Sequence, residues 1–428
     1  MRCRRPRDTR RAPATLIGSP LAALLAAAGA LLGCQPAPSE GPEGLVTGPW
    51  RASLDSPGGA ITFGMELEEE PDGTRVTLVN GQERRAAGLV RMDGRAVRID
   101  LPPYRSTLVA TADPDGGGLV GYWERDAGEG AAPVLPFAAL AGADGRPPAP
   151  PDPAAIEALR GRWRVRFAGD EEDAVGVFEV EPTGRASGTF LTTLGDYRFL
   201  SGWFDGAALR LACFDGAHAF LFEARADGDG RLLGDFWSRD SYHTTWEASK
   251  DPAASLPDDF ALTRWVDDGG LADLSFPDLD GRPTTLGELV PRGTPFLLVV
   301  FGTWCPNCND LTEFLVELRR EFEGIEVVGI AFEMGSDPAR HRAALQGYVA
   351  HHGIDHPVLL GGSASKEHAS AALPILDRVR AYPTTVFLDG ERRATAVHTG
   401  FSGPATGAAH STLRERFRSE VESLLAGD

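Results

Sequence analysis

Two cysteines in the stretch VVFGTWCPNCNDL are the residues of this 428-residue chain best suited to chemistry. Cys305 and Cys308 are separated by Pro306 and Asn307, and they follow an apolar run that reaches Phe301. Cysteines at this spacing can clip a metal ion, form a structural disulfide, or exchange electrons as a redox pair. The surrounding residues favour one of these three chemistries.

A metal site and a structural staple both fit poorly. Zinc takes four ligands, usually from two such cysteine pairs or from one pair and two histidines. The chain has no second pair, and His351, His352 and His356 lie at the end of a predicted helix. A disulfide across four residues would stabilise little, because the chain-entropy gain grows with loop length. We therefore expect no metal and no cofactor other than a redox-active Cys305–Cys308 disulfide.

The redox interpretation fits the local physics. Residues 295–302, PFLLVVFG, are typical of a buried central strand, and residues 308–322 show helical apolar spacing. Cys305 would then lie at a helix N-terminus, where Pro306 suits the first turn and the helix dipole stabilises a thiolate. Thiols in such places have pKa values lowered to about 3.5–7.5. Cys308, one turn further on, is placed to resolve a mixed disulfide.

The elements that must position this pair alternate between strand and helix. A buried strand is predicted at 325–332, a helix at 338–353 with Asp337 as its cap, and a hairpin at 382–399 that turns at Asp389-Gly390. A last helix is lined by Leu413, Phe417, Val421 and Leu424. This order predicts an α/β sheet with crossover connections.

The preceding part of the chain is rich in short strands and appears twice. Runs such as RVTLVN and AVRIDL are punctuated by Asn80-Gly81 and Asp93-Gly94, which indicates an antiparallel barrel or sandwich. Three anchors recur at an offset of 112 to 114: Trp50 with Trp163, Asp93-Gly94 with Asp205-Gly206, and Trp123-Glu124-Arg125-Asp126 with Trp237-Ser238-Arg239-Asp240. We therefore expect two tandem antiparallel all-β modules.

These patterns together predict the domain organisation. The expected parts are a signal peptide at 1–33, a tether at 34–48, β modules at 49–140 and 154–250 joined by a Pro-rich linker at 141–153, a second linker at 251–265, and the α/β domain at 266–428.

The N-terminus carries an export signal. A basic segment precedes an apolar one, and Leu31-Leu32-Gly33-Cys34 resembles a bacterial lipoprotein signal, which implies lipidation of Cys34. Gln35, directly after this cysteine, weakly favours a location in the outer membrane. The alternative is an uncleaved membrane helix. The expected location is lipid-anchored and facing the periplasm or cell surface, where disulfides persist. A formal charge of −19 disfavours nucleic-acid binding.

Two segments resemble the signatures of the thioredoxin superfamily: WCPNC at 304–308 and YPTTVFLD at 382–389. The likeness is closest to membrane-tethered, extracytoplasmic TlpA/ResA-type thiol–disulfide oxidoreductases, and it covers residues 271–428. It implies that Cys305 is the nucleophile, Cys308 the resolving thiol and Pro383 a cis-proline facing both. Trp304, Tyr382 and Thr384 are then expected to contact substrate.

The sequence departs from that family where a proton acceptor is expected. Val299 and Leu311 stand at positions where relatives carry a carboxylate. Glu333, at the end of the strand IEVVGIAF, is our first candidate for the base, and Asp310 is the second. Because the carboxylates are not at the family's positions, the sequence does not decide whether the dithiol reduces its substrates or its disulfide oxidises them.

A reductase of exported proteins, recharged by a membrane electron donor and held at the bilayer through Cys34, is the leading hypothesis. A thiol oxidase and a binding lipoprotein whose β modules hold a ligand are the alternatives. A peroxidase fits poorly, because Thr303 is too close to Cys305 for a TxxC motif. Cys213, in the apolar run ALRLACF, is expected to be buried and inert.

Overall fold

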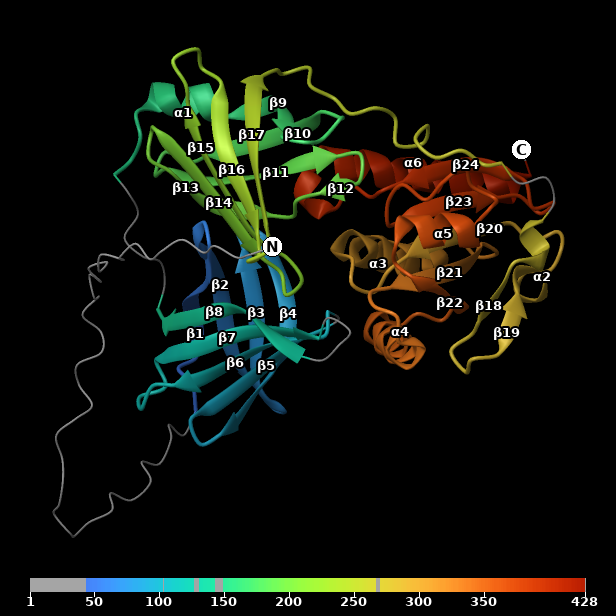
Figure 1. The fold of residues 1–428 in the computed structure, drawn as a ribbon, viewed down its shortest axis with the longest axis horizontal. Helices are drawn as coiled ribbons and strands as arrows, with labels where there is room; N and C mark the ends of the chain where they lie inside the picture. The colour runs from blue at the N-terminus through green and yellow to red at the C-terminus, as the bar shows by residue number, and fades with distance from the viewer. Residues whose placement is uncertain (1–43, 103, 127–130, 143–148, 267–269, 428) are drawn as a thin grey trace, which may run out of the picture. The chain divides into compact units, whose positions relative to one another are not determined.

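The computed structural model describes residues 44–102, 104–126, 131–142, 149–266 and 270–427. Within these residues the chain forms two β-barrels followed by an α/β sheet (Figure 1). The expected signal peptide and the lipidation site Cys34 lie outside the described residues. No helix in the described part of the chain has the length and apolar character needed to cross a bilayer.

The first β module is a closed barrel of eight antiparallel strands, in which each strand pairs with the next and β1 pairs with β8. Alternate residues along the strands face inward, as the pattern of β2 shows. The turns at Gly81 and Gly94 have positive φ, as the Asn-Gly and Asp-Gly signals predicted. The strands are β1 Gly48–Ser56, β2 Gly59–Glu70, β3 Gly73–Asn80, β4 Glu83–Asp93, β5 Ala96–Leu101, β6 Ser106–Ala112, β7 Gly118–Asp126 and β8 Ala131–Ala141.

The second β module repeats this architecture. The short helix α1 (Pro153–Leu159) precedes it, with Asp152 as its N-cap. Pairing of β10 with β11 and of β9 with β17 closes the sheet, and the two-residue strand β12 extends one hairpin. The strands are β9 Gly161–Phe167, β10 Ala174–Val180, β11 Arg185–Thr192, β12 Gly195–Asp196, β13 Leu200–Phe204, β14 Ala208–Phe214, β15 Ala219–Ala226, β16 Leu232–Ser238 and β17 Tyr242–Lys250.

The predicted repeat is confirmed in detail. Trp50 and Trp163 lie on the first strand of their barrels, and each indole N–H donates to the carbonyl four residues earlier, at 2.7 and 2.8 Å. Trp123 lies on β7, the seventh strand of the first barrel, and Trp237 lies on β16, the seventh strand of the second when the two-residue β12 is not counted. Because Trp50 and Trp163 make the same hydrogen bond at the same strand of the two copies, the repeat is present in the structure as well as in the sequence.

The barrels are filled and joined by side chains. An apolar cluster fills the first barrel, and Phe214 of the second barrel packs into it, 4.7 Å from Phe63 and 5.1 Å from Trp123 between ring centroids. The side chain of Asn80 bonds both the N–H and the carbonyl of Phe214, at 3.1 and 2.9 Å. Cys213 lies beside it in the second barrel's core, where burial raises its pKa, as expected of an inert thiol.

The C-terminal part is a five-stranded sheet of order β22-β21-β20-β23-β24, preceded by the two-stranded sheet of β18 and β19. β20, β21 and β22 are parallel, whereas β23 and β24 are antiparallel to their neighbours. This is the thioredoxin-like arrangement that the resemblance implied. The strands are β18 Ser275–Pro277, β19 Pro283–Thr285, β20 Phe296–Phe301, β21 Glu326–Glu333, β22 Val358–Ser363, β23 Thr384–Leu388 and β24 Ala394–Thr399.

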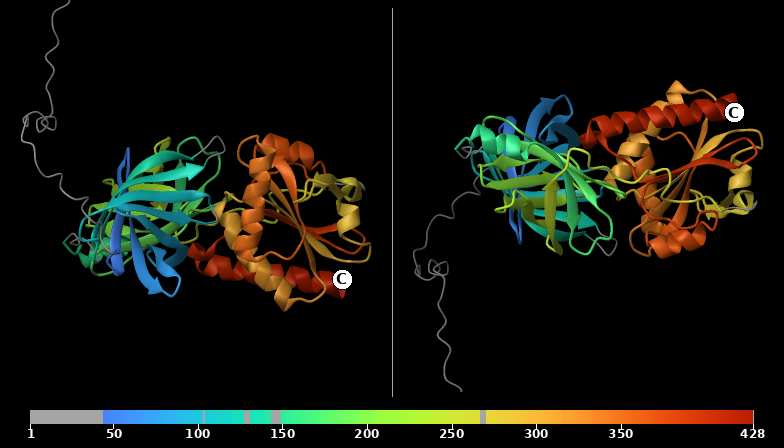
Figure 2. Two further views of the ribbon diagram at one scale, coloured as in Figure 1. Left: turned by 90° about the horizontal axis from the view of Figure 1, so that it is seen from below. Right: turned by 90° about the horizontal axis from the view of Figure 1, so that it is seen from above.

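Helices cover this sheet at the predicted places. Phe314 of α3 and Phe417 of α6 approach to 5.8 Å, so both helices share one face; α6 is red in Figure 2. Asp337 caps α4, and Gly353 ends it with φ of +62°, as predicted. The helices are α2 Leu286–Leu289, α3 Pro306–Glu321, α4 Pro338–His352, α5 Lys366–Ala372 and α6 Ala408–Ala426, with 3-10 turns at Leu271–Asp273 and Pro404–Thr406.

Two segments predicted as connections are packed instead. Leu45, in the expected tether, is buried in the first barrel. In the expected linker 251–265, Asp259 accepts a bond from His398 at 2.9 Å, and Thr263 accepts one from Thr399 at 2.8 Å. Their polar and Pro-rich composition suggested loose chain, but these side chains have partners far away in the sequence. Residues 143–148 of the Pro-rich linker lie outside the described residues.

Candidate active site

Cys305 sits where the sequence placed it, between a buried strand and a helix N-terminus. Every residue of β20 is buried, and the chain then turns so that Cys305 is the N-cap of α3 with Pro306 in the first turn. The Cys308 N–H donates to the Cys305 sulfur at 3.4 Å. The Cys308 N–H, which has no partner within the helix, and the positive end of the helix dipole thus both favour negative charge on the Cys305 sulfur.

The start of β23 faces this sulfur. β23 runs antiparallel to β20, and Val300 pairs with Thr384, so the segment before Thr384 meets the end of β20. The Tyr382–Pro383 peptide bond is cis, as predicted. The Cys305 thiol donates to the Tyr382 carbonyl at 3.4 Å. Residues 77 positions apart are therefore brought to one point by a single strand pairing.

Trp304 and Tyr382 frame the site, but Thr384 does not. The two rings make an edge-to-face contact at 5.7 Å, and the Trp304 indole N–H donates to Phe332 at 3.0 Å, which leaves Trp304 half-buried. The Thr384 hydroxyl is fully buried and donates to the Ala381 carbonyl at 2.9 Å. The expectation that the Thr384 side chain contacts substrate is therefore corrected: it faces the sheet interior.

Cys308 is fully buried, as a resolving thiol should be. Burial raises the pKa of this thiol well above its usual value, and the neighbouring Cys305 and Glu333 raise it further. Both cysteines are thiols in this structure. A thiol held neutral in this way needs a base before it can attack a disulfide.

Glu333, the first candidate for this base, lies close enough to the dithiol to raise the pKa of Cys308 and has a raised pKa of its own. Its side chain is only 4% exposed, and its two oxygens accept from the Thr303 N–H at 2.9 Å and the Thr303 hydroxyl at 2.7 Å. Burial raises its pKa to about 7, even though the Thr303 bonds favour the charged form. A carboxylate that titrates near neutrality can both take and return a proton.

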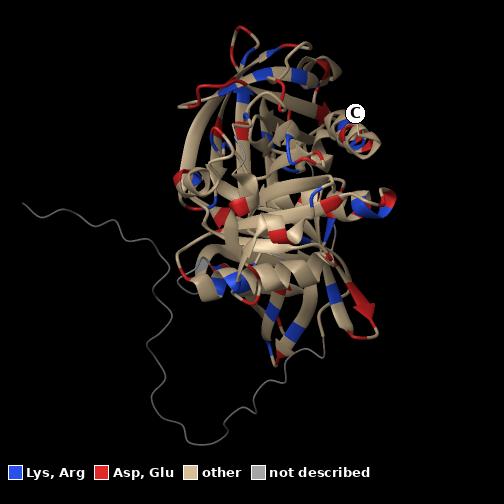
Figure 3. Ribbon diagram, turned by 90° about the vertical axis from the view of Figure 1, so that its right-hand side faces the viewer, with Lys and Arg blue, Asp and Glu red and all other residues tan. Residues whose placement is uncertain are grey.

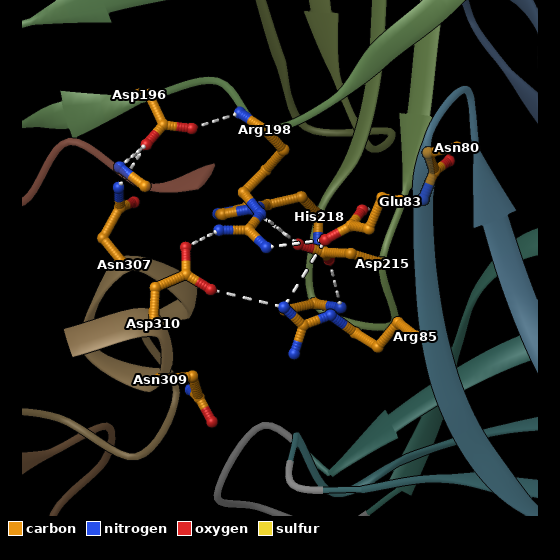
Figure 4. A network of polar contacts seen from close by, with 12 residues as sticks. Asn80, Glu83, Arg85, Asp196, Arg198, Asp215, His218, Asn307, Asn309 and Asp310 are labelled. Atoms are coloured by element: carbon orange, nitrogen blue, oxygen red, sulfur yellow. Dashed lines mark hydrogen bonds and ion pairs between the residues drawn. The ribbon is translucent and has the colours of Figure 1, made fainter. Parts of the chain in front are cut away.

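Asp310, the second candidate for the base, forms ion pairs with residues of the two barrels. Its carboxylate pairs with Arg198 of the second barrel and, at 3.4 Å, with Arg85 of the first (Figure 4). Arg198 is 1% exposed and also pairs with Glu83 at 2.8 Å. Asp310 therefore belongs to a buried ion network between the barrels and α3.

The second barrel also covers the turn between the cysteines. The Asn307 amide donates to Asp196 at 3.0 Å and to the Phe401 carbonyl at 2.9 Å. At Gly195, φ is +143° and a Cβ would lie 2.8 Å from the Asn307 side chain, so only glycine fits there. Pro306 and Asn307 are buried as a result.

Sequence reasoning missed these barrel residues, although the repeat carried a signal for them. Glu83 and Arg85 in the first copy match Asp196 and Arg198 in the second, each 113 positions later and within the repeat offset. An acid two residues before an arginine thus recurs at the same hairpin of both barrels. Both pairs meet the N-terminal turns of α3.

The remaining candidates do not join the site. His352 bonds Asn309 at 2.8 Å on the far side of the helix turn. No group of three or more metal-binding side chains occurs among the described residues.

The chain matches no protein-family model and no curated protein sequence. Solved structures similar to part of it include a secreted Mycobacterium tuberculosis disulfide oxidoreductase homologous to E. coli DsbE, with 20% identity over 37% of this chain and all of that one, at a TM-score of 0.28. A second is a thioredoxin-family thiol:disulfide interchange protein from Chlorobium tepidum, with 21% identity over 35% of this chain and 92% of that one, at a TM-score of 0.27. A third is a Bacteroides fragilis thiol-disulfide oxidoreductase, with 18% identity over 32% of this chain and 95% of that one, at a TM-score of 0.24.

Proposed function

We propose that this chain is an extracytoplasmic thiol–disulfide oxidoreductase that acts by dithiol–disulfide exchange through Cys305 and Cys308. The observation that carries the proposal is the position of the Cys305 sulfur, which accepts the Cys308 N–H at the tip of α3 and faces Tyr382 of the cis-proline loop.

The chemistry follows in two steps. The Cys305 thiolate attacks one sulfur of a substrate disulfide, which forms a mixed disulfide and releases one substrate thiolate. Glu333 takes the proton of Cys308, whose sulfur then attacks Cys305 and releases the second thiolate. Two electrons pass to the substrate, and a Cys305–Cys308 disulfide remains for a membrane electron donor to reduce.

We further propose that the protein works as a reductase of exported proteins and is anchored by acylation of Cys34. A reduction potential more negative than that of the compartment supports a reductase, and a strongly oxidising potential supports the oxidase alternative. The binding-lipoprotein alternative receives no support from the barrel interiors, which are filled by side chains.

Reduction of insulin disulfides by the full chain tests the proposal. We expect turnover by the wild type and none by Cys305→Ser. Cys308→Ala is expected to accumulate mixed disulfides, which identify the substrates. Equal activity of wild type and Cys305→Ser would refute dithiol exchange.

A further inference from the structure

A small pocket adjoins the candidate active site. It has a volume of about 220 Å³, and Thr303, Trp304 and Glu333 form part of its wall. Strand ends and loops of both barrels form the rest, together with Met334 and the α4 residues Arg340, His341 and Ala344. A molecule in this pocket would lie against the residue that directly precedes Cys305 and against the proposed base.

The two barrels contribute matching positions to this pocket. Arg105 and Arg125 come from the first barrel, and His218 and Arg239 come from the second, 113 and 114 positions later. Arg125 and Arg239 belong to the Arg-Asp anchor by which the repeat was recognised. The duplication has therefore brought two equivalent arginines to one cavity.

The pocket wall carries an excess of positive charge. Four arginines line it, against the two carboxylates of Asp126 and Glu333. Asp126 pairs with Arg105 and, at 2.9 Å, with Arg340. The chain as a whole is acidic, and its positive and negative positions are interspersed over the described residues (Figure 3). The cationic wall is thus a local feature.

Two of these arginines have no hydrogen-bonded or ion-paired carboxylate among the residues that the structure describes. Within the described ranges, neither the Arg125 nor the Arg239 guanidinium makes a hydrogen bond or an ion pair. Burial lowers the pKa of Arg125 and the like charge of Arg239 lowers it further, whereas the nearby Asp215 carboxylate offsets only part of this effect. Two repelling, partly buried cations are a costly arrangement in the absence of an anion.

Buried polar atoms at the same wall also lack partners. Tyr104 is 4% exposed and His341 is 7% exposed, and both line the pocket. In the part of the chain that the structure describes, the Tyr104 hydroxyl and the His341 Nε2 have no hydrogen-bond partner. An unsatisfied buried polar group costs about 1–3 kcal/mol, so a ligand with oxygen atoms would stabilise this wall.

We propose that this pocket binds the carboxylates of a small anionic disulfide, with Arg125 and Arg239 as the pairing groups, and that the adjacent dithiol reduces it. The inference rests on the proposed function and adds a substrate class to it. The volume is below the roughly 300–1,000 Å³ of drug-sized sites, which indicates a small ligand. Pro306 and Asn307 are buried under the second barrel, so a small disulfide is expected to reach Cys305 more readily than a protein disulfide does, although both can react.

Electrons balance without a further reactant. The disulfide of the ligand accepts two electrons and becomes two thiols, while Cys305 and Cys308 lose two electrons and two protons and become a disulfide. One turnover of the pre-reduced full chain therefore tests the proposal without the unknown physiological donor.

The experiment compares three small disulfides of different charge: dithiodiglycolate, 2-hydroxyethyl disulfide and cystamine. Second-order rate constants for oxidation of the reduced chain would be measured for wild type, Arg125→Gln, Arg239→Gln and the double variant. Arg282→Gln, which removes an arginine 77% exposed in the α/β domain, is the matched control. We expect wild type to prefer the dianion, each pocket variant to lose about tenfold with the dianion alone, and the control to lose nothing.

Each outcome has a defined meaning. Equal losses with the dianion and the neutral disulfide, or no loss with either, would overturn the pocket proposal while leaving the dithiol chemistry intact. Absence of Cys305-dependent reaction with every disulfide would instead refute the proposed function. Arg125→Lys keeps the charge and is expected to retain most of the preference for the dianion. Its rate with the neutral disulfide reports whether the fold is intact.

Discussion

The two sides of the dithiol turn each bury a carboxylate, but in opposite electrostatic settings. Among the residues that the structure describes, the Glu333 carboxylate accepts hydrogen bonds from the neutral Thr303 alone, and burial raises its pKa to about 7. Asp310 lies between Arg198 and Arg85 and forms ion pairs with both. The comparison teaches that a buried carboxylate without a counterion can exchange protons, whereas one with counterions holds the barrels against α3.

The first test removes the counterions from the Asp310 side. Arg198→Met leaves Asp310 and Glu83 buried without their main partner, and we expect a loss of about 3–5 kcal/mol in unfolding free energy. Arg85 is 15% exposed and makes longer contacts of 3.4 and 3.5 Å, so Arg85→Met is expected to cost about 1 kcal/mol.

Chemical denaturation followed by circular dichroism measures both losses. Arg225→Met, at an exposed position of the second barrel, is the matched control and is expected to change stability by less than about 0.5 kcal/mol. Equal losses for Arg198→Met and Arg85→Met would contradict the central place of Arg198.

The second test uses the pH dependence of stability on the Glu333 side. Between its ordinary pKa of 4.5 and its folded pKa of about 7, Glu333 stays protonated in the folded state but not in the unfolded chain. Its contribution is therefore complete below pH 4.5 and is lost as the pH rises to 7, by roughly 3 kcal/mol.

Glu333→Gln stays neutral at every pH and should escape that loss. We expect the variant to gain stability relative to wild type between pH 4 and pH 8, measured by denaturation at each pH. Asp310→Asn is expected to show no such gain. A stability difference between Glu333→Gln and wild type that does not vary with pH would show that Glu333 titrates normally.

The third test asks whether Glu333 acts in the chemistry. If it removes the Cys308 proton, the rate of mixed-disulfide resolution should rise with pH through about 7, and Glu333→Gln should lower that rate about 100-fold and remove the inflection. Single-turnover kinetics across pH 5–9 measure this. Asp310→Asn should keep the inflection; its loss in that variant would reverse the assignment of the two carboxylates.

The sequence predicted the parts of this site that depend on local physics. The strand before Cys305, the helix after it and the Asp337 cap are set by short motifs, whereas the cis bond at Pro383 was implied by the family resemblance. The α/β domain and the repeated β modules followed from hydrophobic periodicity and from anchors at one offset.

The contacts between modules could not be predicted in the same way. Arg198 and Asp196 lie among strand residues where isolated charges usually face solvent, and the Asp310 partners are more than 100 positions away. Closure of each sheet into a barrel likewise depends on pairing of distant strands, such as Trp50 with Ala141. Local propensity carries no information on such pairings, so Asp310 remained a candidate base and residues 251–265 a linker.

The smallest expected effect concerns the contact between the second barrel and the turn that joins Cys305 to Cys308. Asp196→Asn keeps the shape of the side chain but weakens its bonds to the Asn307 amide and, at 2.6 Å, to the Gly403 N–H. We expect a loss of about 1 kcal/mol and a severalfold faster alkylation of Cys305 by iodoacetamide, because Pro306 and Asn307 become more accessible. Glu247→Gln, at an exposed position of the same barrel, should alter neither quantity. Unchanged alkylation in Asp196→Asn would mean that the second barrel holds the turn without restricting access to it, and the preference for small substrates would then have to come from the pocket alone.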